Sequence, residues 1–238
     1  MQQSKEVLIK GIKTGIITAG DNLIEVFEKA LKSCALKEKD VLIISSKVVA
    51  VTQGMVKSFS GQAGFNRLVK SEADRVIGRG PVTLTLKNGI FIPWAGIDRS
   101  NAKKGSAVLW PLKPFESAAK IRKELCGKYR LRNLGVVVSD SHCVPLRKGV
   151  TGVAIGYAGF KGVKDLRGRN DLYGNKLKVT QQNVADMLAS AAHLVMGEAA
   201  ERTPFALVRN APVEFVGSRT NPREPLMPPE ECLFGPLY

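Results

Sequence analysis

The sequence has few aromatic residues, only two histidines and no long apolar run. Aromatic residues make up 6% of the chain, which leaves few platforms for stacking the bases of single-stranded nucleic acid. Two histidines exclude a histidine-rich metal site. No apolar run approaches the roughly 20 residues needed to span a bilayer, and the first residues lack the charged-then-apolar order of a signal peptide. We therefore expect a cytoplasmic protein.

Neither cysteine nor glycine occurs in a familiar binding motif. The four cysteines lie far apart and form no CxxC pair, which excludes a zinc knuckle and a thioredoxin-like motif. The chain contains no GxxxxGK[ST] sequence, and no GxGxxG sequence opens a helix after a strand. A P-loop and a simple dinucleotide-binding fold are therefore excluded.

What the chain does have is an excess of positive charge. Its 36 lysines and arginines against 21 acidic residues give a formal net charge of +15, which predicts attraction to anions. The charge alone does not distinguish nucleic acid from a small substrate that carries phosphates and carboxylates. With 44% hydrophobic and 24% charged residues among 238, the composition is typical of a globular protein with a sizeable core. Enzymes and binding modules both remain open.

Apolar spacing predicts an alternation of helices and short buried strands. Helices are expected over Asp21–Ser33, with Asp21 as N-cap, over Phe115–Cys126, and from about Thr180 to Gly197. Buried strands are expected at Val41–Ile44, Gly135–Val138 and Phe205–Val208, and a hairpin is expected to turn at Asn88-Gly89. Irregular backbone is expected over Gly149–Gly174, and an extended Pro-rich tail from Asn221.

Polar residues follow several of these elements. Ser45-Ser46-Lys47 and Ser139-Asp140-Ser141 each follow a buried strand, and Asp98 follows the hairpin. Asp98 could equally cap its own backbone in an Asx-turn, and Asp140 could cap a helix. Glu198 directly follows the expected helix end at Gly197, where a carboxylate is unfavourable unless a cation lies nearby.

Three carboxylates from separate element ends, together with hydroxyls, form the hard-oxygen site that Mg²⁺ or Mn²⁺ prefers when it is bound with substrate phosphates. Lys47 and Arg147 could then neutralise phosphate oxygens, although a single surface cation is usually only solvated. His193 lies on the expected long helix, where a packed or solvated histidine is the more common role than a ligand.

Several ordered motifs carry a resemblance to a known family. They are Ala95-Gly96-Ile97-Asp98-Arg99-Ser100-Asn101, Ser139-Asp140-Ser141 with Pro145 and Arg147, Val153-Ala154-Ile155-Gly156, the Gly159–Gly174 segment with Asp165, Arg167, Gly168 and Asp171, and Val195-Met196-Gly197-Glu198. In this order and spacing, from about Gly11 to about Pro212, the chain resembles coenzyme F420-0:L-glutamate ligase. The resemblance implies an α+β fold with mixed sheets and amphipathic helices, assembled as an interlocked homodimer. We expect one catalytic domain over residues 1–219, which two lobes could share, and a tail over residues 220–238.

The resemblance also implies an activity and a set of site residues. The activity is the addition of L-glutamate through an amide bond, with GTP or ATP as co-substrate and Mg²⁺ or Mn²⁺ as cofactor. The implied metal positions are Asp98, Asp140, Ser141 and Glu198. The expected nucleotide-binding residues are Gly11, Ile12, Lys13, Thr14, Ser45, Ser46, Lys47 and Asn101. The expected catalytic residues are Asp98, Asp140 and Arg147.

The chain departs from the family pattern in three segments. Asp140-Ser141-His142-Cys143-Val144-Pro145-Leu146-Arg147 stands where the family usually has Asp-Thr-x-Gly-Arg-Pro-Trp-Arg, so one arginine and a glycine are replaced. The family's Lys-Ala-Glu-Gly is replaced by Val51-Thr52-Gln53-Gly54, and its Asp-Glu-Gly is replaced by Ala200-Glu201-Arg202. The metal and nucleotide positions are kept, whereas the region expected to meet the acceptor differs.

The acceptor therefore has two candidates. F420-0 fits the family, and a folate fits the altered region because a glutamate-tailed pterin has carboxylates but no phosphodiester for the missing arginine to hold. The alternatives are a folylpolyglutamate synthase-like activity with no role in F420 chemistry and a catalytically inactive protein that binds nucleic acid. Retention of all three acidic positions argues against nucleic acid as a partner. No membrane partner is expected. The apolar Pro-rich tail is expected to lie either on the partner subunit or on its own lobe.

Overall fold

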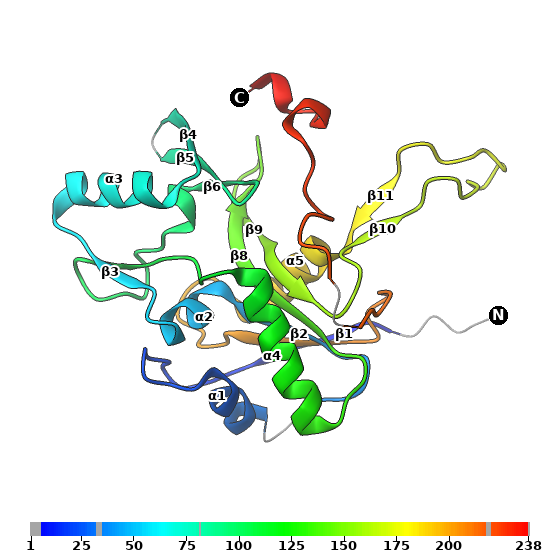
Figure 1. Cartoon of the computed structure of the whole chain (residues 1–238), viewed down its shortest axis with the longest axis horizontal. Helices are drawn as coiled ribbons and strands as arrows, with labels where there is room; N and C mark the ends of the chain where they lie inside the picture. Colours follow the sequence, from blue (N-terminus) through cyan, green and yellow to red (C-terminus); the bar gives the residue numbers. More distant parts are fainter. Residues whose placement is uncertain (1–5, 32–34, 81, 218–219, 238) are drawn as a thin grey trace.

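The computed structural model describes residues 6–31, 35–80, 82–217 and 220–237 (Figure 1). Its central sheet has the strand order β1-β12-β2-β8-β9. The strands are β1 (Leu8–Ile12), β2 (Val41–Ser45), β8 (Gly135–Cys143), β9 (Val150–Ala158) and β12 (Phe205–Arg209). β2 and β8 pair in parallel, and the other neighbours pair antiparallel. This mixed sheet, with the helices packed on it, confirms the expected α+β class.

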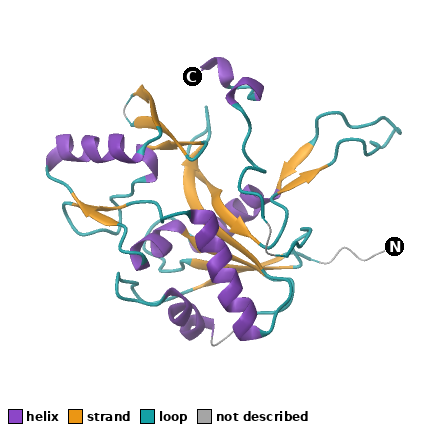
Figure 2. Ribbon diagram, viewed as in Figure 1, coloured by secondary structure: helices purple, strands orange, loops and turns teal. Residues whose placement is uncertain are grey.

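Helices cover both faces of the sheet, which explains why its central strands are apolar throughout (Figure 2). α1 (Leu23–Ala30) and α4 (Pro114–Tyr129) pack on one face, and α5 (Val184–Met196) packs on the other. In β2, Leu42 and Ile44 face α1 and α4, whereas Val41 and Ile43 face α5. A strand buried on both faces reads as a continuous apolar run, as the sequence predicts for Val41–Ile44.

A second group of elements lies beside the central sheet. It contains α3 (Gly61–Glu72) and the antiparallel strands β4 (Arg75–Arg79), β5 (Thr83–Lys87) and β6 (Ile90–Pro93). β3 (Val56–Ser58) pairs with β7 (Ser106–Val108), and α2 (Ser46–Thr52) leads into this group from β2. Asn88 and Gly89 both have positive φ, at 51° and 79°, as a two-residue hairpin turn requires. The predicted hairpin is confirmed.

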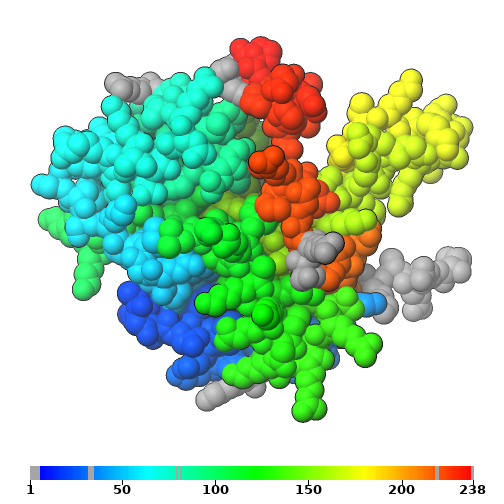
Figure 3. Space-filling view, viewed as in Figure 1, coloured from blue at the N-terminus to red at the C-terminus, as the bar shows by residue number. Residues whose placement is uncertain are grey.

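An arm and a tail complete the chain. β10 (Val163–Asp165) and β11 (Gln181–Asn183) form the base of an arm that projects from the body, and the tail runs beside it (Figures 1 and 3). Glu224 in the tail accepts hydrogen bonds from the Tyr157 hydroxyl at 2.8 Å and the Gly162 N–H at 2.7 Å. The tail thus begins on its own chain. Contrary to expectation, it is not simply extended, because it contains short 3-10 helices at Pro229–Glu231 and Gly235–Leu237.

Two predicted helix starts are wrong by one to four residues. Asn22, not Asp21, caps α1 and accepts from the Ile24 N–H at 3.0 Å. Asp21 instead accepts from the Thr18 N–H at 2.6 Å. α1 is described to Ala30, and the expected end at Ser33 lies outside the described residues. α5 begins at Val184 because β11 takes the preceding residues and the Asn183 side chain caps the helix. None of the described helices is long and apolar enough to cross a membrane.

The expected irregular backbone over Gly149–Gly174 is also wrong, because it contains the long strand β9. Its glycines allow helix backbones to pack closely against the strand. A Cβ on Gly152 would lie 2.5 Å from the Ala189 carbonyl carbon of α5, and one on Gly156 would lie 2.4 Å from that of Pro114 at the start of α4. The two glycines face opposite sides because the β8–β9 register shifts between Val138 and Ser139, as at a β-bulge. Both helices can therefore approach one strand.

We expect Gly156→Ala to lower the free energy of unfolding by about 2 kcal/mol, because the added methyl group forces α4 away from β9. Gly127→Ala, within α4, is the matched control: no atom lies within 4 Å of its added Cβ, and helix propensity favours alanine by up to about 1 kcal/mol. Urea unfolding measures both variants. Equal stability of Gly156→Ala and the wild type would contradict the close approach.

Candidate functional site

Several predicted segments meet at one edge of the central sheet. The parallel pairing places Ser45 of β2 opposite Ser139 of β8. At the same edge β12 begins, and the Ser45 N–H donates to the carbonyl of Pro204 at 2.9 Å. The end of the β1 segment joins them, because the Thr14 N–H donates to the carbonyl of Arg202 at 2.8 Å. The fold therefore brings together segments that are far apart in the sequence.

Gly11 fixes the approach of β1 to the end of α5. A Cβ on Gly11 would lie 2.8 Å from the Val195 carbonyl oxygen and 2.8 Å from a carbon of Thr203, so only glycine allows this contact. Ile12 is 4% exposed, and its side chain belongs to the core and so does not face a ligand. Lys13 is exposed. The predicted Gly11–Thr14 segment is thus held beside the loop that carries Glu198.

Asp98 forms the Asx-turn that was one of the two roles left open by the sequence, and its metal-binding role stays a prediction. Its carboxylate accepts from the N–H of Ser100, as an Asx-turn requires, and it also forms an ion pair with Lys47. The Lys47 ammonium donates to the Ser100 hydroxyl at 3.0 Å. Both partners are partly exposed: the Lys47 side chain is 28% exposed and the Asp98 side chain is 37% exposed. Lys47 therefore supplies positive charge directly at the predicted metal position.

Asp140 is partly buried in β8, just beyond the parallel pairing with β2. Burial raises the pKa of its carboxyl above the usual 3.8, and the nearby charge of Asp98 also raises it. Hydrogen bonds from the Trp110 indole, the Ser141 backbone and the Ser46 side chain oppose this shift by stabilising the charged form. The ionised carboxylate is therefore less favourable here than in water, and a nearby cation would favour it.

Trp110 was not singled out by the sequence. Its indole N–H donates to Asp140, 30 residues away, and no local pattern indicates such a contact. A left-handed turn makes room for it: Trp94, Ala95 and Gly96 have φ values of 52°, 55° and 70°. A Cβ on Gly96 would lie 2.0 Å from the indole nitrogen. Gly96 in the motif thus allows the indole to reach the carboxylate.

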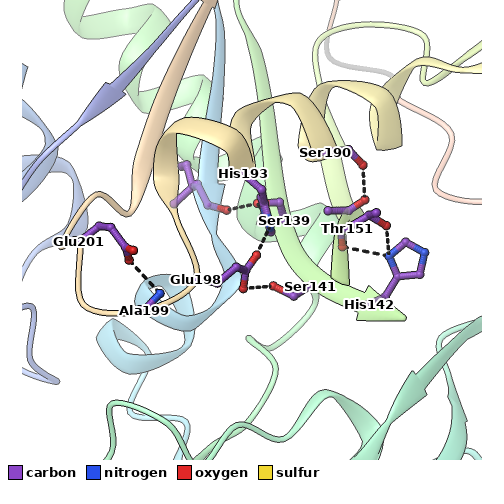
Figure 4. A network of polar contacts seen from close by, with 11 residues as sticks. Ser139, Ser141, His142, Thr151, Ser190, His193, Glu198, Ala199 and Glu201 are labelled. Atoms are coloured by element: carbon purple, nitrogen blue, oxygen red, sulfur yellow. Dashed lines mark hydrogen bonds and ion pairs between the residues drawn. The ribbon is translucent and has the colours of Figure 1, made fainter. Parts of the chain in front are cut away.

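Glu198 lies in a polar network at the end of α5 (Figure 4). It accepts from the Ser141 hydroxyl at 2.7 Å, and its other oxygen lies 2.8 Å from Nδ1 of His193. The other ring nitrogen of His193 lies 3.1 Å from the Ser139 hydroxyl. His193 is therefore neither merely packed nor solvated, because it links Ser139 to Glu198. It occupies the place where the helix end required a donor or cation.

Other predicted residues join this edge only in part. Asn101 donates to the Ala199 carbonyl at 3.2 Å and so ties the Asp98 loop to the Glu198 loop. Arg147 lies in the exposed loop after β8, and within the described ranges its side chain makes no polar contact with these residues. Among the described residues, no group of three or more His, Cys, Asp or Glu is arranged to hold a metal ion by itself.

Comparison with known proteins gives this geometry a context. The model of the F420-0:gamma-glutamyl ligase family matches residues 11–210. The chain belongs to this family. It is 31% identical to the coenzyme F420:L-glutamate ligase of Methanocaldococcus jannaschii, over 98% of this chain and 99% of the relative. It is 35% identical to the protein of that name from Archaeoglobus fulgidus, over 85% of this chain and 87% of the relative. The expected family is confirmed.

The substituted segment lies at the outer end of β8, next to the site of this F420-0:gamma-glutamyl ligase family member. Nδ1 of His142 lies 3.2 Å from the Thr151 carbonyl oxygen on β9, and Cys143 is exposed. The chain therefore has the free thiol of Cys143 where the family pattern has glycine and Val144 where it has arginine, and His142 stands at the position that the pattern leaves open. These side chains distinguish the surface beside Asp140.

We expect Asp140→Asn to leave the free energy of unfolding at neutral pH unchanged or raise it by about 1 kcal/mol, because the amide removes a charge whose burial is unfavourable. The folded-state pKa of Asp140 is raised, so the wild type loses stability as the pH rises from the unfolded value of 3.8 through the folded value. Any advantage of the variant should therefore disappear below that range. Urea unfolding at several pH values measures it.

Asp40 provides the contrast. It is 2% exposed, and it accepts from the Lys37 N–H at 2.8 Å and from Arg209 at 3.2 Å. Asp40→Asn should cost about 2 kcal/mol, somewhat less than for a fully buried pair because the Arg209 side chain is 22% exposed. A loss of similar size in Asp140→Asn would show that Asp140 supports the fold rather than a ligand.

Proposed function

We propose that the protein is a ligase that joins L-glutamate to an anionic acceptor through an amide bond, using a nucleoside triphosphate. The observation that carries the proposal is the meeting of the Gly11–Thr14 and Ser45-Ser46 segments with Asp98, Asp140 and Glu198 at one sheet edge. The relatives that share this family are named as L-glutamate ligases. The positive net charge of +15 suits polyanionic substrates.

The chemistry needs activation, because joining a carboxylate to an amine in water is uphill. A carboxylate oxygen of the acceptor attacks the γ-phosphorus, and the bond from that phosphorus to the β-phosphate oxygen breaks, which releases the nucleoside diphosphate. The glutamate amine then attacks the activated carbonyl carbon. The C–N bond forms, the amine loses a proton, and inorganic phosphate leaves. The protein must therefore bind two clusters of negative charge close together.

Different residues at this edge of the sheet would bind the different charged groups. Ser45, Ser46 and the Gly11–Thr14 segment would bind the nucleotide, and the Thr14 and Ser45 N–H groups hold these segments in place by donating to the Arg202 and Pro204 carbonyls. Asn101 ties the Asp98 loop to the Glu198 loop beside them. Lys47 can exchange its ion pair with Asp98 for a phosphate oxygen, because a partly exposed pair contributes only about 1 kcal/mol or less. This exchange releases the Asp98 carboxylate for another cation.

The carboxylate and hydroxyl oxygens fit a divalent cation. Asp98 and Asp140 form one pair of donors, and Ser141 and Glu198, whose side chains touch at 2.7 Å, form another. Mg²⁺ commonly binds one or two carboxylates and completes its shell with substrate phosphates and water. These four residues would hold Mg²⁺ or Mn²⁺ together with the nucleotide. The metal would neutralise charge on the phosphate oxygens.

The acceptor is F420-0 or a folate. The names of the relatives favour F420-0. The replacement of the family arginine by Val144, next to His142 and Cys143, favours an acceptor without a phosphodiester. Both acceptors belong in the same experiment, because they share a carboxylate that must be activated.

We also propose that the active form is a homodimer. The arm between β10 and β11 projects from the body (Figure 1), and its side chains Leu172 and Tyr173 are 100% and 90% exposed. Two such apolar side chains at the tip of an arm fit contact with a second copy of the chain. The tail is not needed for this proposal, because Glu224 holds it to its own chain.

The pure protein should add glutamyl units to F420-0 or to a reduced folate in the presence of glutamate, Mg²⁺ or Mn²⁺, and GTP or ATP. Mass spectrometry of the acceptor counts the added units, and omission of each component in turn identifies what is required. No added mass with any acceptor would contradict the proposed function. If the same protein then bound nucleic acid with a steep salt dependence, the nucleic-acid alternative would be favoured.

In the same assay, Asp140→Ala should reduce the rate by about a thousandfold or more, because it removes a carboxylate that would hold the metal against the phosphates. Glu116→Gln is the matched control, since among the described residues its exposed carboxylate on α4 pairs only with Lys113. Its rate should stay within about twofold of the wild type. Wild-type turnover of Asp140→Ala would exclude the assigned role.

Static light scattering at low micromolar concentration should give the mass of a dimer for the wild type. The double variant Leu172→Ser with Tyr173→Ser should shift the population toward monomer, because it removes exposed apolar area from the arm. Truncation after residue 219 is the control and should remain dimeric. A monomeric wild type, or a double variant that stays fully dimeric, would contradict the role of the arm.

A further inference from the structure

A pocket of about 500 Å³ lies between α3 and the β4–β5 hairpin, separate from the polar cluster at the sheet edge. Its lining includes the polar side chains Gln62 and Asn66 and the cations Lys70 and Arg99, and none of its lining residues is acidic. Neither Lys47, Asp98 nor Asp140 lines it. The pocket is therefore a positively charged cavity, separate from the site, that the proposed chemistry has not used.

Arg99 is held in a defined orientation within this pocket. Its guanidinium lies 4.5 Å from the ring centre of Phe65 and 5.1 Å from that of Trp94. Phe65 is fully buried, and the two rings contact each other edge to face at 5.6 Å. Stacking of a planar guanidinium on fixed rings leaves its N–H groups free to point outward and reduces the entropy lost on binding.

Neither cation of the pocket has an acidic partner in the described part of the chain, whereas three nearby lysines form ion pairs. Lys57 and Lys87 both form ion pairs with Glu72, and Lys47 forms one with Asp98. No ion pair or side-chain hydrogen bond to Arg99 or Lys70 is found among the described residues. Two unpaired cations in one cavity fit an anionic ligand.

The remaining lining limits the class of anion. Val69 and Val76 give the cavity an apolar wall, while Gln62 and Asn66 offer amide groups. A planar carboxylate matches the two parallel N–H donors of a guanidinium. A ligand with carboxylates joined by short methylene chains therefore fits better than a bare inorganic anion, which has nothing to place against the valines.

We propose that this pocket binds the carboxylates of glutamyl groups, an inference that rests on the proposed glutamate ligase function. Arg99 directly follows Asp98 in the sequence, so the pocket lies one residue from a carboxylate of the reaction site. The glutamyl carboxylate has two sources: free L-glutamate and a γ-glutamyl chain already attached to an acceptor. The same guanidinium would recognise either.

The two tryptophans of the chain make a direct test possible. Trp94 lines the pocket and Trp110 contacts Asp140, so 5-fluorotryptophan labelling gives one ¹⁹F signal for each site, assigned with Trp94→Phe. The labelled full chain is titrated separately with L-glutamate, a tri-γ-L-glutamate peptide and inorganic phosphate. Saturable movement of the Trp94 signal with glutamate or the peptide is expected. Tighter binding of the peptide assigns the pocket to the acceptor chain, and equal or tighter binding of glutamate assigns it to the free amino acid.

Arg99→Gln should weaken the binding of the tighter carboxylate by about tenfold, because a charge-assisted bidentate contact is lost. Arg67→Gln on α3 is the matched control, since it removes the same charge from an exposed position outside the pocket; its affinity should stay within about twofold. An unchanged Trp110 signal in Arg99→Gln shows that the fold is retained.

Three results would overturn the inference: no saturable movement of the Trp94 signal with either carboxylate, the same affinity in Arg99→Gln, or phosphate binding as tightly as the carboxylates. These results are independent of the ligase assay. Glutamyl addition without carboxylate binding at Trp94 would leave the proposed function standing and reject the pocket. Binding at Trp94 without glutamyl addition would reject the proposed function and leave a carboxylate site.

Discussion

The parallel pairing of β2 with β8 is the constraint on which the site depends. Parallel strands end at the same edge of a sheet, so the residues that follow them meet there. The register sets Ser45 opposite Ser139 and thereby brings Ser46 close to Asp140. Because both strands are buried on both faces by α1, α4 and α5, a slip in their register would expose the core. The same packing that stabilises the sheet therefore fixes the separation of the polar groups.

Each carboxylate of the site already has a partner from the chain itself, and the strength of these contacts differs. Asp98 forms an ion pair with Lys47, and Asp140 accepts a hydrogen bond from the Trp110 indole. Glu198 contacts a ring nitrogen of His193. The Asp98 pair is partly exposed, so exchanging it for a phosphate and a metal costs about 1 kcal/mol or less. The buried pair of Asp40 with Arg209 is a different case, because breaking it would leave an uncompensated charge inside the fold. The exposed pair at the proposed ligand edge is thus replaceable, whereas the buried pair at the opposite end of β2 is structural.

The central helices and strands and the family could be predicted from the sequence, because local apolar patterns and recognisable motifs indicate them. Strand and helix periodicity gave the central elements, and the ordered motifs gave the family. The errors lie where tertiary contact overrides local preference. Glycines in β9 suggested irregular backbone, yet Gly152 and Gly156 are there because helix backbones lie against the strand.

The contacts of Trp110 with Asp140 and of His193 with Ser139 span 30 and 54 residues. The periodic spacing of apolar residues cannot predict contacts between residues so far apart in the sequence. Trp110 and the bridging role of His193 were therefore accessible only from the fold. The roles of the metal and nucleotide positions remain predictions, even though the fold brings most of these residues to one edge.

The segment between β6 and β7 connects the pocket to the polar site through its backbone. Trp94 lines the pocket, and Gly96, two residues later, lies directly beneath the indole that contacts Asp140. Asp98 then pairs with Lys47, and Arg99 returns to the rings of Phe65 and Trp94. The left-handed turn at Trp94–Gly96 is anchored by the hydrogen bond from the Ala95 N–H to the buried Thr85 hydroxyl at 2.8 Å. Because this strained turn is held at one fixed point, its residues cannot move independently, and a ligand that orders Arg99 would also restrict the backbone that presents Asp98.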